Sequence, residues 1–215
     1  MSSKLIFFIR HGGAFHNVLY KKIGMNALLS SDVIDSPLTE AGYNQAHICR
    51  SSFKDDVDLV LVSPLRRALE TADIIFKNKA PIICQEFLRE YPIGKQTCNK
   101  RYDIAKMIDM FPEINFSDIK TNRDIFWTHT PETIEAFDKR IFLSKEYIYK
   151  RPEVKIAIVG HRSYIGKFKD NKIHNIDNGE HEIKHGYPYP YYLSPHKKGK
   201  QYNIHPNGHI IKSKI

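Results

Sequence analysis

The stretch Lys4-Leu-Ile-Phe-Phe-Ile-Arg-His-Gly-Gly13 decides the fold prediction. Its apolar residues, at 5–9, run continuously instead of alternating with polar ones, which is typical of a β-strand buried on both faces. Similar runs occupy 58–62 and 154–159, and a weaker one occupies 81–84. These four segments are the expected strands of a largely parallel sheet.

Helix signals alternate with these strands. Thr39 is a candidate N-cap, and both Ser63-Pro64 and Thr130-Pro131 pair a capping residue with a proline suited to a first turn. The pattern predicts helices over about 40–51, 64–77 and 101–111, and one with apolar residues spaced along 134–148. Weak strand signals follow near 191–193 and 207–211. The order of elements predicts a three-layer α/β/α sandwich around a mostly parallel sheet.

Composition excludes several classes of protein. With 215 residues and 41% hydrophobic content, the chain is not expected to be mainly disordered, and it fits one domain over 1–215. We expect a core at about 4–167 and a loop-rich, basic segment at 168–215. The three cysteines form no Cys-x-x-Cys motif, which argues against a zinc ribbon. The apolar run at 5–9 is too short for a signal peptide or a membrane helix, so we expect a cytoplasmic protein without a membrane partner.

The charge balance points toward anionic partners. Lys and Arg number 33 against 24 Asp and Glu, giving a formal net charge of +9. Nine lysines fall within residues 167–215, so a basic nucleic-acid-binding tail is one interpretation. That segment contains no recognisable nucleic-acid-reading motif, and we do not expect nucleic acid to be the partner.

Reactive side chains follow the predicted strands. The first strand is followed by Arg10-His11, the third by His161, and the second by a helix carrying Arg66 and Arg67. Because ligands bind beyond the carboxyl ends of strands in open α/β sheets, these groups are expected to converge. Guanidinium groups match phosphate oxygens, and a neutral histidine can accept a phosphoryl group covalently. The pattern favours phosphoryl transfer.

Several motifs together resemble the histidine phosphatase superfamily, which includes the phosphoglycerate mutases. They are Arg10-His11-Gly12 followed by His16-Asn17, then the segments 36–42, 63–72 and 158–161, in the order that the family shows. The resemblance covers about residues 4–167 and implies a phosphoglycerate mutase-like fold.

The resemblance also implies roles for individual residues. His11 is the expected nucleophile, and Glu90 the expected proton donor, with Glu86 as the alternative one helical turn away. The expected phosphoryl-binding residues are Arg10, Asn17, Arg66 and His161. The sequence departs from the family at Gly13 and Ala14, where related proteins usually have Gln or Glu followed by Gly or Ser, so a polar side chain that could contact substrate is missing. It departs again at Arg162, which could contact phosphate or crowd the pocket.

The resulting hypothesis is a metal-independent phosphatase that hydrolyses a small phosphomonoester through a phosphohistidine, without a cofactor. Two alternatives remain open: a phosphoglycerate mutase, and a non-catalytic module that binds a phosphorylated partner or nucleic acid. A metal site at His11 and His16 is a further alternative, although no compact motif supplies a third ligand. The sequence does not predict the oligomeric state.

Overall fold

Strands from both ends of the chain meet in one sheet. The computed structural model describes residues 3–173, 183–196 and 201–207, and within them the strand order is β4-β3-β2-β5-β1-β6-β7. The strands are β1 (Lys4–Arg10), β2 (Leu59–Val62), β3 (Ile82–Cys84), β4 (Ile114–Asn115), β5 (Lys155–Gly160), β6 (Pro188–Pro195) and β7 (Tyr202–Pro206). The four strand runs predicted from the sequence are therefore confirmed as β1, β2, β3 and β5.

The central strands are parallel and buried. β5 pairs in parallel with both β1 and β2, with Arg10 opposite Gly160 and Val62 opposite Val159. Their side chains are apolar on both faces because helices cover the sheet on both sides. On the other side of β1, β6 runs antiparallel, and β7 pairs antiparallel with β6.

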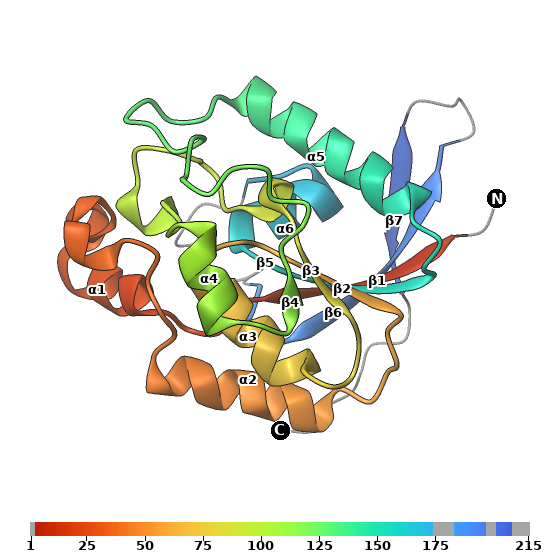
Figure 1. The fold of residues 1–215 in the computed structure, drawn as a ribbon. Coiled ribbons are helices and arrows are strands. Elements are labelled where there is room, and N and C mark those ends of the chain that lie inside the picture. Colours follow the sequence, from red (N-terminus) through yellow and green to blue (C-terminus); the bar gives the residue numbers. More distant parts are fainter. Residues whose placement is uncertain (1–2, 174–182, 197–200, 208–215) are drawn as a thin grey trace.

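Helices form the outer layers (Figure 1). One face packs against α2 (Glu40–Ser52), α3 (Arg66–Phe76) and α4 (Ile104–Met110). The other packs against α5 (Ile134–Lys150) and α6 (Arg162–Asp170). Alternate strand residues divide between the two cores, with Phe7 and Ile9 in one and Ile6 and Phe8 in the other. The predicted three-layer α/β/α sandwich is confirmed.

Helix starts agree with the sequence patterns only in part. Thr39 caps α2, its hydroxyl accepting a hydrogen bond from the Gly42 amide at 3.1 Å. The helix predicted from Pro64 begins instead at Arg66, whose amide donates to the buried Asp35 carboxylate at 2.7 Å. Likewise, α5 begins after Thr133, not after Thr130. A carboxylate distant in sequence thus supplies the acceptor for α3 that Ser63 was expected to provide.

The C-terminal part of the chain contributes more structure than its pattern indicated. The weak strand signal at 191–193 lies within β6, which is longer than that signal. The signal at 207–211 lies outside the described residues from 208 onward. Within the part of the chain that the structure describes, no helix is both long and apolar enough to cross a membrane.

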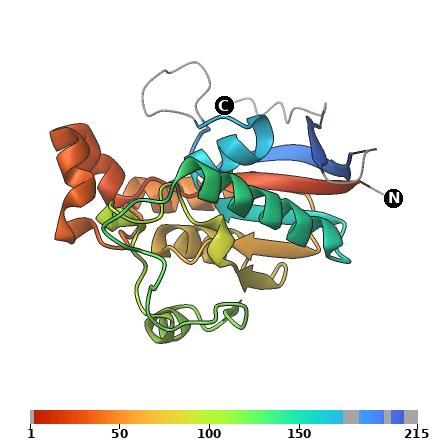
Figure 2. The same cartoon turned by 90° about the horizontal axis from the view of Figure 1, so that it is seen from above.

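A helical segment projects beyond the carboxyl ends of the central strands (Figure 2). It consists of α1 (Phe15–Ile23) and the short 3₁₀ turns Gly24–Leu29 and Ser31–Val33. Its first residues are held against α2 by a close backbone approach: a Cβ atom on Gly42 would lie 2.1 Å from the Gly13 carbonyl oxygen. Because glycines occupy positions 12 and 42, the chain that leaves β1 can lie directly against the backbone of α2.

Candidate active site

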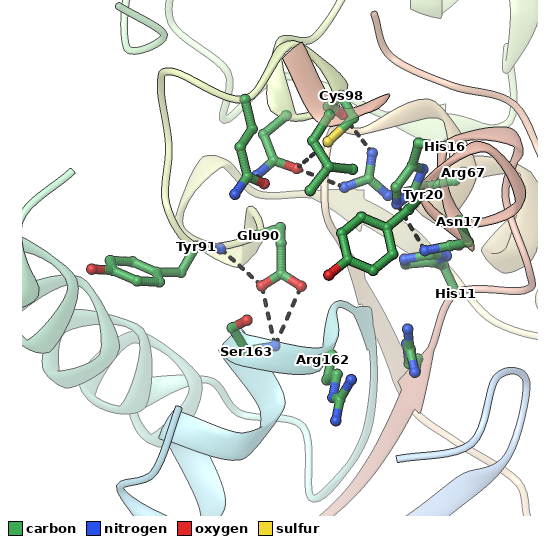
Figure 3. Close-up of a pocket in the computed structure, with 14 residues that line it drawn as sticks. His11, His16, Asn17, Tyr20, Arg67, Glu90, Tyr91, Cys98, Arg162 and Ser163 are labelled. Atoms are coloured by element: carbon green, nitrogen blue, oxygen red, sulfur yellow. Dashed lines mark hydrogen bonds between the residues drawn. The ribbon is translucent and has the colours of Figure 1, made fainter. Parts of the chain in front are cut away.

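A small cavity lies at the carboxyl ends of β1 and β5, with a volume of about 130 Å³. Figure 3 shows its walls, which come from α1, from α3, from the loops after β3 and from the start of α6. The lining residues that carry charge or can donate a hydrogen bond include Arg10, His11, His16, Asn17, Tyr20, Arg67, Glu90, Gln96, Asn99, Arg162 and Ser163. Groups separated by about 150 residues of chain are thus collected in one site.

His11 is held with one ring nitrogen engaged. It directly follows β1, and its Nδ1 lies 2.7 Å from the Gly12 carbonyl oxygen. Because a carbonyl oxygen can only accept, Nδ1 carries the proton. Burial, followed by the positive charge of Arg67, holds the pKa of His11 well below its ordinary value. The ring is therefore neutral near pH 7, with its lone pair on Nε2.

His161 lies directly behind His11. The two ring centroids are 5.1 Å apart, and the His161 Nε2 atom lies 2.7 Å from the Ser63 hydroxyl oxygen. The ring is fully buried and is not among the cavity-lining residues. Its Nδ1 atom is buried and has no hydrogen-bond partner among the described residues. Desolvation is the main cause that lowers the pKa of His161 well below its ordinary value.

Asn17 orients the second histidine of the signature, His16. The Asn17 carbonyl oxygen accepts from the Ala14 amide, and its amide group donates to Nε2 of His16 at 3.0 Å. Nδ1 of His16 must then carry the ring proton in the neutral form, and this buried donor has no partner among the described residues. The ring centroids of His11 and His16 are 5.9 Å apart. No group of three or more His, Cys, Asp or Glu side chains is arranged to hold a metal ion anywhere in the described ranges.

The structure brings Arg67 to the cavity, and not the neighbouring Arg66. Arg67 is 1% exposed, donates to the Cys98 carbonyl and to the Asn99 side chain, and lines the cavity. The predicted phosphate ligand, Arg66, instead forms an ion pair with Glu70 at 2.8 Å and does not line the cavity. The expectation for Arg66 is therefore corrected. The two side chains point in different directions because adjacent residues are about 100° apart around a helix.

Two further predicted arginines do line the cavity. Arg10, the last residue of β1, donates to the Ile183 carbonyl at 2.9 Å and is nearly buried. Arg162, the first residue of α6, lies on the opposite wall from α1 (Figure 3). The side chain of Arg162 thus forms part of the wall of the site.

The two candidate proton donors occupy different environments. Glu90 lines the cavity, and its carboxylate accepts from the amides of Tyr91 and Ser163 at 2.8 and 3.1 Å. Glu86 is engaged by two arginines, Arg101 at 2.7 Å and Arg89 at 3.4 Å, and it does not line the cavity. The geometry therefore favours Glu90 over Glu86.

Sequence reasoning missed His185. Its Nδ1 lies 2.5 Å from the His11 carbonyl oxygen, and its ring centroid is 5.3 Å from that of His11. Burial, together with Arg10, lowers the pKa of His185 to about 4. Its position depends on an isolated β-bridge between Arg10 and His185, and no local sequence motif predicts that bridge. For Arg67, by contrast, the signal was present beside Arg66 in the same helix.

Comparisons with known proteins identify the family of this chain. The chain matches the histidine phosphatase superfamily (branch 1) over residues 6–168. A phosphoglycerate mutase-like protein of Arabidopsis thaliana is 28% identical over 197 residues, covering 75% of this chain and 72% of that relative.

Solved structures share the fold. A phosphoglycerate mutase from Bacillus anthracis superposes with a TM-score of 0.60 at 18% identity, covering 96% of this chain and 93% of that one. The ecdysone phosphate phosphatase from Bombix mori, solved with tungstate, gives a TM-score of 0.58 at 15% identity, covering 95% and 92%. At these identities the likeness concerns the fold alone. Because the family match spans most of its length, this chain belongs to the histidine phosphatase superfamily.

Proposed function

We propose that this protein is a phosphatase that hydrolyses a small phosphomonoester through a covalent phosphohistidine at His11. The observation that carries the proposal is the neutral His11 ring, anchored through Nδ1 and set beside two buried arginines. This arrangement leaves Nε2 as a nucleophile in surroundings that favour a dianionic phosphoryl group.

In the first step, Nε2 of His11 attacks phosphorus and the bond from phosphorus to the ester oxygen breaks. Glu90 gives its proton to the departing oxygen. Arg10 and Arg67 neutralise the phosphoryl oxygens, and the unpartnered Nδ1–H of His16 is placed to donate a further hydrogen bond. In the second step, water attacks phosphorus, returns a proton to Glu90 and releases inorganic phosphate, which restores neutral His11.

The nucleophile is tested by His11→Ala, with His47→Ala, an exposed histidine on α2, as the matched control. We expect at least a 10³-fold loss of phosphate release from p-nitrophenyl phosphate in His11→Ala, because a covalent route has no substitute nucleophile. An acid-labile phosphoenzyme should form in the wild type and in His47→Ala only. Circular dichroism checks that both variants fold. Undiminished turnover by a folded His11→Ala would exclude the proposal.

The mutase alternative is decided in the same preparation. With 3-phosphoglycerate as substrate, a phosphatase releases inorganic phosphate, whereas a mutase forms 2-phosphoglycerate without net release. We expect phosphate release to exceed isomerisation.

The assignment of Arg67 predicts unequal effects from two adjacent arginines. Arg67→Ala should weaken inhibition by orthovanadate by about 10²-fold, since charge-assisted hydrogen bonds contribute about 1.5–3 kcal/mol each. Arg66→Ala removes the same charge from a residue that pairs with Glu70 and does not line the cavity, so we expect less than a threefold change. Inhibition constants measured at constant ionic strength make the comparison. Equal losses in the two variants would contradict the assignment.

Buried neutral histidines make stability depend on pH. The pKa values of His11, His16, His161 and His185 are lowered in the folded protein, so the unfolded chain binds more protons below about pH 6.5. Stability is therefore present above pH 6.5 and is lost as the pH falls. Asp35, whose pKa burial raises to about 6, acts in the opposite direction, but it is one group against four.

We expect the free energy of unfolding in phosphate-free buffer to fall by about 4–5 kcal/mol between pH 7.5 and 5.5. The measurement is urea denaturation at both values. His185→Gln should reduce the difference by about 1 kcal/mol, whereas His47→Gln should leave it unchanged. A difference that is zero or reversed in the wild type would show that these histidines are protonated in the folded state.

A further inference from the structure

A second, larger cavity adjoins the His11 cavity. Its volume is about 690 Å³, and it shares Arg10, Asn17, Tyr20 and Arg162 with the smaller one. Cavities that hold small-molecule ligands measure about 300–1,000 Å³. The His11 cavity, at about 130 Å³, is below that range and the second lies within it. A substrate whose phosphoryl group is at His11 would therefore place the rest of its structure in the second cavity.

The second cavity is lined by positive charge. Lys21 of α1 and Lys184 of the C-terminal segment line it together with the two shared arginines, and none of its described lining residues is acidic. Lys21 and Lys184 have no ion-pair partner among the described residues. Cations of one sign gathered around a concave surface raise the local concentration of anions.

Backbone contacts hold the second lysine in place. The Lys184 amide donates to the Tyr189 hydroxyl at 2.9 Å, and the Gly186 amide donates to the Arg10 carbonyl at 2.9 Å. Between them, His185 hydrogen-bonds to the His11 carbonyl. The backbone of Lys184 is thereby connected through one short segment to the backbone of His11, which defines where this lysine enters the cavity wall.

Small residues keep the second cavity open. Gly13 and Ala14 both line it. A Cβ atom on Gly13 would lie 3.5 Å from the Gln45 side-chain oxygen and 3.7 Å from the Thr39 hydroxyl, and both of those residues also line the cavity. A larger side chain at position 13 would therefore extend into this space.

We propose that the second cavity is an anion subsite, with Lys21 and Lys184 as specificity-determining residues, and that the substrate carries a second phosphate or carboxylate group. This inference rests on the proposed function only in placing the first phosphoryl group at His11. An anionic group on the leaving part of the substrate would contact both lysines, whereas a neutral leaving group would make no use of the basic cavity wall.

Binding of non-hydrolysable phosphonates tests the subsite independently of catalysis. The probes are α,ω-alkane bisphosphonates of three to six carbons, the ω-carboxyalkyl phosphonates, and the ω-hydroxyalkyl phosphonates as neutral references. Calorimetry at constant ionic strength gives each dissociation constant. We expect at least one chain length at which an anionic terminus binds about tenfold tighter than the hydroxyl terminus. Comparing the two anionic series distinguishes phosphate from carboxylate.

Variants assign the effect to the two lysines. Lys21→Ala and Lys184→Ala should each reduce that preference at least threefold, and Lys22→Ala, which removes the same charge from the neighbouring position outside the cavity, should preserve it. Equal affinity for charged and neutral termini at every length, or an equal loss in Lys22→Ala, overturns the proposal. Absence of phosphate release and of a phosphoenzyme would instead overturn the proposed function, so the two failures are separable.

Discussion

The in-register parallel pairing of β5 with β1 and β2 is the constraint on which the site depends. Pairing continues one residue beyond the strands: the His11 amide donates to the Gly160 carbonyl at 2.9 Å, and the Ser63 amide donates to the Val159 carbonyl at 3.1 Å. His11, Ser63 and His161 are therefore the first residues past three adjacent strands. Their side chains meet because the backbone ladder places them there, before any side-chain contact is made.

The electrostatics of the site follow from that placement. His11, His16 and His161 lie close to buried arginines and are kept neutral, because protonation would add a second positive charge in an environment shielded from water. In the proposed function, the neutral His11 is the nucleophile, and the arginines supply the positive charge that an incoming phosphoryl dianion offsets. Glu90, whose carboxylate is held at the start of α6 by backbone amides, is the acidic residue among the described residues that line the cavity.

Much of the fold could be predicted because continuous apolar runs identify buried strands, and the resemblance to a known family identified His11 and its neighbours as candidates. The choice between Arg66 and Arg67 could not be made from spacing alone. It depends on where α3 begins, and that is set by Asp35, thirty-one residues earlier in the chain. His185 could not be predicted, because an isolated parallel bridge to Arg10, just before β6, brings it to the site and no local sequence pattern indicates that bridge.

The proposed function requires that Nε2 of His11 form a bond to phosphorus. The most direct measurement is a crystal structure of the protein with orthovanadate, whose pentacoordinate form mimics the phosphoryl group in transfer. We expect a vanadium–nitrogen bond to Nε2 of His11, with vanadate oxygens contacting Arg67. Vanadate bound elsewhere, or bound in this cavity without a bond to His11, would contradict it.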